Sequence, residues 1–353
     1  MLERLKLQNV GPAPEMELDF AQRVNLITGD NGLGKSFLLD VAWWALTRRW
    51  PQEVNRRMTS GLPARPTDRK RPATITLGVT GKTKTINYIS TYAARDEAWT
   101  GKAGRPWNPG LVIYAHADGS FSVWDPARNY WKKKGDVDIQ ERLAAYVFTP
   151  AEVWNGIKAD VDGAPPICYM LTWSWAEHRL AAVQLGEEPT TQVVMLFDEV
   201  ESHLHPRWQR VILKALRDLV GVLHDQASVQ LIVATHSPLV LASAEPWFDP
   251  KKDAWFDIDL EGKPPRVQLR KRTYTPRGAA GYWLTSEAFD LATDRGSVEA
   301  ERAILQARAL LQEPTPQLAE VMKAHAALRA VLPDVDRFWV RWNAFVEQSG
   351  GQP

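Results

Sequence analysis

The feature that most constrains this chain is the glycine-rich segment Gly29–Ser36, whose sequence is GDNGLGKS. The apolar run Val24–Ile27 precedes it, and a helical face that begins at Phe37 follows it. Glycines between a buried strand and a helix let successive backbone N–H groups and the helix N-terminus face one anion. The segment therefore predicts an α/β fold with a phosphate-binding loop at the end of a buried strand.

The same loop supplies the side chains that a bound nucleotide requires. Lys35 can reach the outer phosphates, and the Ser36 hydroxyl can bind magnesium. The other residues that we expect to contact the nucleotide are Asn31, Gly32, Gly34 and Phe37. The alternative is a glycine-rich turn with a surface lysine, and the motifs downstream argue against it.

Two further apolar strands end in residues suited to phosphate chemistry. Gln192–Phe197 leads into Asp198 and Glu199. The first carboxylate would support the metal ion, and the second would polarise the attacking water. Val229–Ala234 leads towards His236, which we predict senses the γ-phosphate. A strand that merely ends in acids, or a lone histidine, is often structural, but here both follow the glycine loop in the order of a nucleotide site.

Taken in this order, the three elements resemble the ABC-type ATPases of the RecF/SMC-like branch of AAA ATPases. Glu201–Gln209 resembles the loop after the metal carboxylate in that branch, and Thr235–Ser243 resembles its histidine-switch segment. Together with the segment Trp173–Arg179, these two segments resemble bacterial defence-island ATPases, such as those of Septu-like and retron-linked systems. The resemblance covers residues 1–50 and about 110–290.

The resemblance implies an α/β fold of the ABC-type P-loop NTPase head, with a mixed sheet, an antiparallel subdomain and a helical C-terminal extension. It implies ATP and Mg²⁺ as ligands, with Ser36 and Asp198 at the metal. Glu199 and His236 are the implied catalytic residues. The expected divisions are an ATPase domain over 1–290, a connector at about 50–72, a shortened lobe at about 150–167 and an extension over 291–353.

The implied function is ATP-gated control of a partner effector, in anti-phage defence or DNA maintenance. The expected partners are a second copy of the chain, as a homo-dimer or higher oligomer, an effector such as an HNH-type nuclease, and DNA. The competing interpretation is a nucleotide-binding scaffold, in which ATP sets assembly with little hydrolysis. A transporter ATPase is disfavoured by the segments HLHP and THSP and by the lack of a clear glutamine loop for coupling to membrane domains.

Composition limits the other classes of protein. Lys+Arg 43 against Asp+Glu 42 gives a formal net charge of +1, so binding to nucleic acid would need a local patch. The single cysteine, Cys168, excludes an intramolecular disulfide and a thiolate zinc cluster. No apolar run reaches the roughly 18 residues that span a bilayer, so we expect a cytoplasmic location without membrane contact. Residues that could form a basic patch, or only a solvated surface, are Arg69, Lys70, Arg71, Lys82, Lys84, Lys102, Arg105 and Lys132–Lys134.

Periodicity predicts the remaining elements. The composition of the connector at about 50–72 suits an exposed or mobile loop. Further strands are expected at 74–79, 85–90, 111–115 and 120–124, and turns at 99–110 and 118–119. Helices are expected at 138–147, 167–185, 208–220, 297–312 and 316–348, the last interrupted at Pro333.

One family element has no clean copy in this chain. ABC sites are completed across a dimer by a signature loop, Ser-x-Gly at a helix start, which contacts the γ-phosphate of the other subunit. One register uses Ser174–Glu177, where alanine replaces glycine. The other, which we favour, uses Lys158–Gly163, where no serine remains. A glutamine loop is equally hard to find, because the chain is shortened after 154–156.

If the signature loop is Lys158–Gly163, the purified chain should hydrolyse ATP slowly. If the loop presents Asp160 and Asp162 to a γ-phosphate, closure of the dimer brings like charges together. We expect steady-state ATP hydrolysis well below the roughly 1–100 s⁻¹ typical of kinases. A serine- and glycine-containing loop at 158–163 should raise turnover and dimerisation together. Brisk turnover by the unmodified chain without a partner would instead place the signature at Ser174.

Overall fold

The computed structural model shows two compact units, Met1–Ala280 and Gly281–Pro353. The domain boundary expected at 290 remains a prediction. In the described part of the chain, no helix has the length and hydropathy needed to span a bilayer. The residues described are 1–80, 84–100, 110–127, 145–152, 166–184, 186–202, 204–224 and 227–352.

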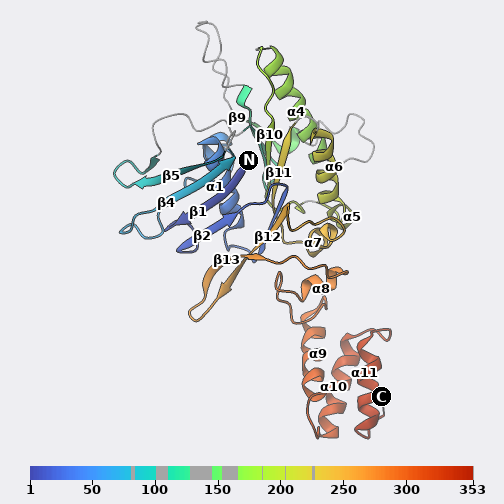
Figure 1. Ribbon diagram of the computed structural model, residues 1–353. Coiled ribbons are helices and arrows are strands. Elements are labelled where there is room, and N and C mark those ends of the chain that lie inside the picture. Colours follow the sequence, from blue (N-terminus) through green and yellow to red (C-terminus); the bar gives the residue numbers. More distant parts are fainter. Residues whose placement is uncertain are drawn as a thin grey trace. The chain divides into compact units, whose positions relative to one another are not determined.

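A mixed eight-stranded sheet forms the centre of the first unit (Figure 1). Five of its strands, from β12 to β7, run parallel to one another, and β13, β8 and β9 pair antiparallel at its two edges. This arrangement confirms the expected mixed sheet. The strand order is β13 (Arg266–Arg272), β12 (Asp253–Glu261), β3 (Val24–Gly29), β11 (Ser228–Ala234), β10 (Gln192–Phe197), β7 (Leu111–Ala115), β8 (Phe121–Trp124) and β9 (Ala145–Phe148).

The second sheet has five strands and is antiparallel throughout, which confirms the expected antiparallel subdomain. On β1, Leu2, Leu5 and Leu7 are fully buried while the residues between them are partly or fully exposed, as a sheet with one covered face requires. The strand order is β2 (Glu15–Asp19), β1 (Leu2–Gln8), β4 (Thr74–Thr80), β5 (Thr85–Ala93) and β6 (Ala98–Thr100).

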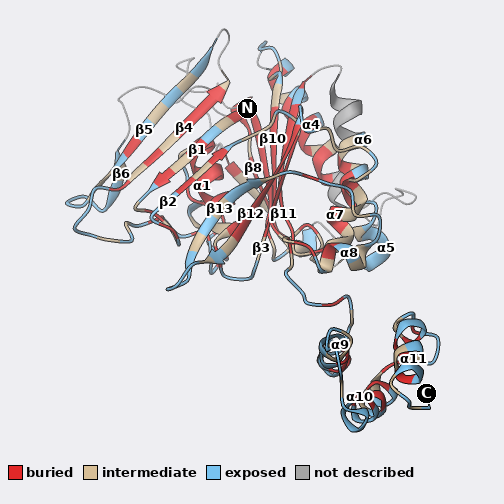
Figure 2. Ribbon diagram, turned by 60° about the horizontal axis from the view of Figure 1, so that its bottom comes forward, coloured by how far each residue is buried: buried red, intermediate tan, exposed pale blue. Residues whose placement is uncertain are grey.

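Helix α1 (Lys35–Thr47) lies between the two sheets (Figure 2). It contacts β1 on one side and β3, β7, β10 and β11 on the other. Its sequence is apolar on nearly every side, because a helix covered by two sheets has no solvent-facing stripe. Trp43 is fully buried, and Trp44 stacks on Trp50 with ring centroids 5.1 Å apart. The helix that begins at the phosphate loop is therefore part of the main core.

Helices of the other layer cover the opposite face of the eight-stranded sheet (Figure 1). One of them packs against β7 and a second against β11. The second has apolar residues on one face, in agreement with the amphipathic pattern in its sequence. The helices of this layer are α4 (Pro166–Gln184), α5 (Pro206–Gln209), α6 (Ile212–His224) and α7 (Pro238–Ala244).

The unit Gly281–Pro353 has its own apolar core, built from three helices in its described residues. They are α9 (Val298–Leu310), α10 (Leu318–Val331) and α11 (Phe338–Gln348), and the shorter α8 spans Ala280–Leu284. The break between α10 and α11 confirms the interruption expected at Pro333. Both observations confirm the helical C-terminal extension.

Two expectations about local structure are wrong. The helix expected at 138–147 is not found at 145–147, because Ala145–Phe148 is strand β9; residues 138–144 lie outside the described part. Short apolar runs do not distinguish helix from strand, and pairing with β8 decides this case. The connector is not simply exposed, since Trp50 is buried and α2 spans Pro51–Val54.

Other segments differ in detail from the expected elements. Residues 98–100 form strand β6, where a turn was expected to begin at 99, and 101–109 lie outside the described residues. The helix expected over 208–220 is divided between α5 and α6. The antiparallel pair β12 and β13 was not anticipated at all. Their alternating acids and arginines satisfy each other across the pair, which single-strand patterns do not reveal.

The C-terminal unit should be sensitive to loss of its largest core side chain. Trp342 is fully buried in the core of α9, α10 and α11. We expect Trp342→Ala to lower the free energy of unfolding of this unit by about 3–5 kcal/mol. Urea denaturation followed by circular dichroism measures the change. Val340→Ala, on the same helix at 81% exposure, is the control and should change it by less than about 0.5 kcal/mol.

Candidate functional site

The three predicted motifs meet at one edge of the central sheet. Strands β3, β11 and β10 are parallel neighbours, so their carboxyl ends lie side by side. Gly29 ends β3, Thr235 follows β11, and Asp198 follows β10. Ligands of parallel α/β sheets bind at this edge. The fold therefore brings together the glycine loop, the two acids and the histidine segment.

Backbone geometry explains why the loop needs glycine. Gly29 has φ +135°, and a Cβ there would lie 2.2 Å from the carbonyl oxygen of Ile258. Gly34 has φ +106°, and a Cβ there would lie 2.7 Å from Pro12 Cγ. These angles place the chain so that α1 begins directly at Lys35, with no acidic residue in its first turn and no side-chain cap. The N-terminus of α1 is thus suited to an anion.

The side chain of Lys35 is held inside the loop. Its ammonium donates to the carbonyl oxygens of Gly29 at 2.7 Å and Asp30 at 2.8 Å. Burial lowers the pKa of Lys35 to about 8, and the nearby carboxylates of Asp198 and Glu199 oppose that shift. A buried cation beside a helix N-terminus is the charge distribution that phosphate oxygens require.

Ser36 and Asp198 face each other across the site. The Ser36 hydroxyl donates to Asp198 Oδ1 at 3.0 Å. Burial raises the pKa of Asp198 to about 6, and the charge of Glu199 adds to the increase. Two hard oxygen donors fit Mg²⁺. Among the described residues, no three His, Cys, Asp or Glu side chains are arranged so that they could hold a metal ion by themselves.

Glu199 adopts an unusual backbone conformation. Its φ is +49°, in the left-handed region that residues other than glycine rarely occupy. The Ser202 hydroxyl donates to Glu199 Oε2 at 2.8 Å, and the Ser202 amide donates to the Glu199 carbonyl oxygen at 2.7 Å. Strain of this kind persists where surrounding contacts hold it, and it concentrates at functional sites. The Glu199 carboxylate is thus fixed beside Asp198.

His236 lies half-buried next to the loop. Burial lowers its pKa, and the positive charge of Lys35 lowers it further, while Glu199 opposes the shift. The imidazole is therefore neutral at pH 7, where one ring nitrogen donates and the other accepts. A neutral ring can hydrogen-bond a phosphate oxygen without adding a competing cation beside Lys35.

Sequence reasoning did not anticipate the role of Glu201. Its half-buried carboxylate accepts from the Thr235 hydroxyl at 2.7 Å and from the His236 amide, which fixes the histidine segment. Gln209 Oε1 accepts from the Ser237 hydroxyl at 2.8 Å, so a second residue of the same loop holds this segment. The two segments that carry the family resemblance thus contact each other. The available signal was a third acid two residues after Glu199.

A second unanticipated group lies beside Ser36 and Asp198. A pocket of about 120 Å³ is lined by Ser36, Asp198, Asp40, Tyr114 and His116, among others. The Tyr114 hydroxyl donates to Asp40 Oδ1 at 3.0 Å, and burial raises the pKa of Asp40 to about 7. A charged residue one helical turn after Ser36, in an otherwise apolar helix, was the sequence signal.

Other predicted residues are placed less centrally. Asn31 and Gly32 are exposed, and Phe37 packs against Gly11. Ser174 is buried inside α4, far from any helix start, which disfavours the first signature register. The loop 158–163 lies outside the described residues.

Part of the basic group lines a separate pocket of about 300 Å³. Its lining includes Arg65, Arg69, Lys70, Arg71 and Tyr92. Lys84, another residue of the basic group, is exposed. The candidates outside the described residues are Lys82, Lys102, Arg105 and 132–134.

Fold and site together define a P-loop nucleotide-binding architecture, and two stretches of the chain match known domain families. Residues 179–242 match the family described as "AAA domain, putative AbiEii toxin, Type IV TA system". Residues 4–101 match the family described as "AAA domain". The first stretch includes Asp198, Glu199 and His236, and the second includes the glycine loop.

A curated relative and solved structures show further similarity. The "Retron Vc95 probable ATPase" of Vibrio cholerae serotype O1 biovar El Tor is 40% identical over 50 residues, which are 14% of this chain and 9% of that protein. The SMC head domain from Thermotoga maritima is 16% identical, with a TM-score of 0.39, over 77% of this chain and 99% of that one. The recombination mediator protein RecF with ATPrS is 13% identical, with a TM-score of 0.42, over 73% and 96%.

The domain matches and the retron relative confirm the resemblance to AAA ATPases and to retron ATPases. The matched segment spans only 9% of the curated relative.

Replacing the buried lysine tests the site directly. Lys35→Ala removes the only side-chain cation of the loop, so we expect it to abolish binding of an ATP analogue. Isothermal titration calorimetry measures the affinity. Lys214→Ala is the control, because Lys214 is exposed on α6 and pairs only with Asp218 among the ion pairs of the described residues. An unchanged affinity of Lys35→Ala would refute the site assignment.

Proposed function

We propose that this chain binds ATP together with Mg²⁺ and hydrolyses it to ADP and phosphate. The observation that carries the proposal is the meeting of the glycine loop, Asp198, Glu199 and His236 at adjacent strand ends, with Ser36 Oγ 3.0 Å from Asp198 Oδ1. The matches to AAA domains support ATP as the nucleotide.

Binding follows from the charges around the loop. The amides at the start of α1 and the Lys35 ammonium face the phosphates, and Ser36 and Asp198 would hold the metal ion. When bound there, Mg²⁺ would neutralise part of the phosphate charge. Asp198 ionises more readily beside such a cation, because the charge offsets the burial that raises its pKa.

Hydrolysis needs a water molecule in line with the γ-phosphorus. Glu199 accepts a hydrogen bond from this water and takes its proton as the new phosphorus–oxygen bond forms. The bond between the γ-phosphorus and the bridging oxygen breaks, which leaves ADP. His236 donates to a γ-phosphate oxygen, so that its segment reports whether that phosphate is present. Glu201 keeps this segment in place through its hydrogen bonds to Thr235 and His236.

The biological use that we propose is control of a partner effector, such as a nuclease, in anti-phage defence or DNA maintenance. The match to a retron ATPase supports this use. We propose assembly as a homo-dimer or higher oligomer, because ABC-type sites close between two copies. We also propose a cytoplasmic location. The cationic pocket beside Tyr92 supports a DNA contact. The adjacent reading frame is the direct test, since an HNH-type nuclease there would support effector control.

A scaffold with little hydrolysis is the second candidate. The sequence favours it because neither signature register offers Ser-x-Gly. Phosphate release, measured on the purified chain alone and together with a candidate partner, separates the two candidates. A scaffold retains ATP in both conditions, whereas an ATPase releases phosphate in at least one of them.

Replacing the proposed base should separate binding from turnover. We expect Glu199→Gln to bind ATP with unchanged affinity, to lower single-turnover hydrolysis by about 10²–10⁴-fold, and to trap any ATP-dependent oligomer. Quenched-flow assays and light scattering with and without ATP measure these effects. Glu188→Gln, an exposed acid before β10, is the control and should behave as the wild type. Hydrolysis by Glu199→Gln at the wild-type rate would show that another group activates water.

A further inference from the structure

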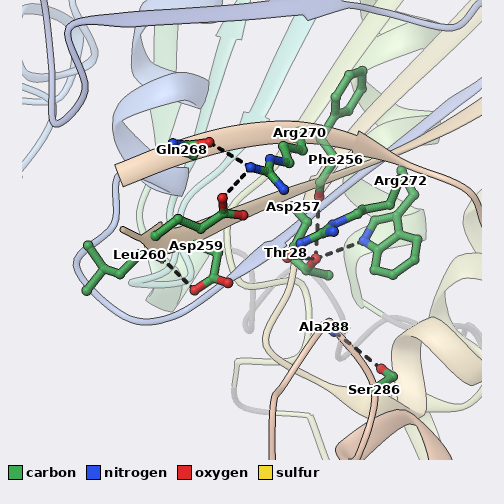
Figure 3. A network of polar contacts seen from close by, with 12 residues as sticks. Thr28, Phe256, Asp257, Asp259, Leu260, Gln268, Arg270, Arg272, Ser286 and Ala288 are labelled. Atoms are coloured by element: carbon green, nitrogen blue, oxygen red, sulfur yellow. Dashed lines mark hydrogen bonds and ion pairs between the residues drawn. The ribbon is translucent and has the colours of Figure 1, made fainter. Parts of the chain in front are cut away.

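A series of buried polar contacts ends at the phosphate loop. Thr28 on β3 directly precedes Gly29 and is fully buried. Its hydroxyl donates to Asp257 Oδ1 at 2.7 Å and accepts from Trp255 Nε1 at 2.8 Å (Figure 3). Both partners lie on the neighbouring strand β12. Thr28 Oγ1 also lies 3.4 Å from the Phe256 carbonyl oxygen, so three groups of β12 set the position of this hydroxyl.

The other oxygen of Asp257 is also paired. Asp257 Oδ2 accepts from Arg272 Nη2 at 3.2 Å and Nε at 3.3 Å (Figure 3). The Asp257 side chain is 2% exposed, whereas that of Arg272, on edge strand β13, is 25% exposed. A buried carboxylate is tolerated when its charge is paired and its oxygens are hydrogen-bonded. These contacts fix Asp257 between β3 and β13.

The same strand pair reaches the lysine of the candidate site. Thr28 is opposite Asp257 in the parallel register, and Gly29 is opposite Ile258. The contact at Gly29 is so close that a Cβ would lie 2.2 Å from the Ile258 carbonyl oxygen. The Gly29 carbonyl oxygen in turn accepts from Lys35 Nζ at 2.7 Å. The residue that bonds Asp257, Thr28, is thus the direct neighbour of Gly29, whose carbonyl oxygen accepts from Lys35.

We propose that Asp257 is a positioning residue for nucleotide binding, which acts through Thr28 to fix the Gly29 carbonyl that holds Lys35. The inference rests on the proposed function and deepens it. Asp257 touches no phosphate. It keeps the loop in the binding conformation before ATP arrives, so less conformational entropy is lost on binding. Without it, the ligand must order the loop, and affinity falls.

The chain contains a matched control at the other end of the same strands. Asp253 also lies on β12, is 2% exposed, and pairs with an arginine, Arg23, whose Nε donates to Asp253 Oδ1 at 2.8 Å. It also accepts from the amide of Val24, the first residue of β3, at 3.2 Å. Asp253 and Asp257 are therefore both buried aspartates that pair with an arginine, but only Asp257 lies next to the loop.

The experiment compares four variants for affinity and thermal stability. Isothermal titration calorimetry with ATPγS and Mg²⁺ measures Kd well below each melting temperature, and circular dichroism verifies folding. We expect Asp257→Asn and Thr28→Val to raise Kd about tenfold, equivalent to about 1.4 kcal/mol. Thr28→Ser, which keeps the hydroxyl, and Asp253→Asn should stay within about twofold of the wild type. Both Asp→Asn variants should lower Tm, because each removes the carboxylate charge that pairs with a partly exposed arginine.

The outcomes separate this inference from the proposed function. If the wild type binds ATPγS and the two variants Asp257→Asn and Asp253→Asn have equal Kd values, the positioning role is refuted and the proposed function is not. Absence of ATPγS binding by the folded wild type would refute the proposed function and this inference with it. If Asp257→Asn fails to fold, Thr28→Val decides the question, because valine keeps the shape of threonine and removes only the hydroxyl.

Discussion

Parallel pairing of β3, β11 and β10 is the constraint on which the candidate site depends. It places three strand ends together although their sequences are far apart, and each end contributes a different chemical group. The register leaves little freedom, because all three strands are buried on both faces. A shift of one residue would exchange the side chains of the two covered faces, which would disrupt their packing and move the loop away from Asp198.

The charged groups at the carboxyl ends of these strands suit a metal ion bound together with a polyphosphate. Asp198 is buried and Glu201 is half-buried, burial raises the pKa of both carboxyls, and Asp40 lies in the pocket beside Asp198. Lys35 is the buried cation among them, and its pKa is lowered. Each group is less stable in its charged form than in water, so a metal ion with a polyphosphate would relieve both kinds of penalty at once.

The sequence predicted the parts of the site that depend on local patterns. The glycine loop, the acids after β10 and the histidine after β11 could be found because each motif is contiguous and follows an apolar strand. Contacts between distant residues were not predictable in this way. Thr28 and Asp257 are separated by 229 positions, and Glu201 binds the histidine segment across 34 and 35 positions. Strand β9 was mistaken for helix because only its pairing partner distinguishes the two.

The burial of α1 between two sheets has a mechanical consequence. A helix with solvent on one side can bend or slide to suit a ligand at its end, but α1 contacts packed strands on both sides. Close-packed interiors transmit displacement rather than absorb it. Any pull on the first turn of α1 is therefore passed to β1 and the antiparallel sheet as a rigid movement.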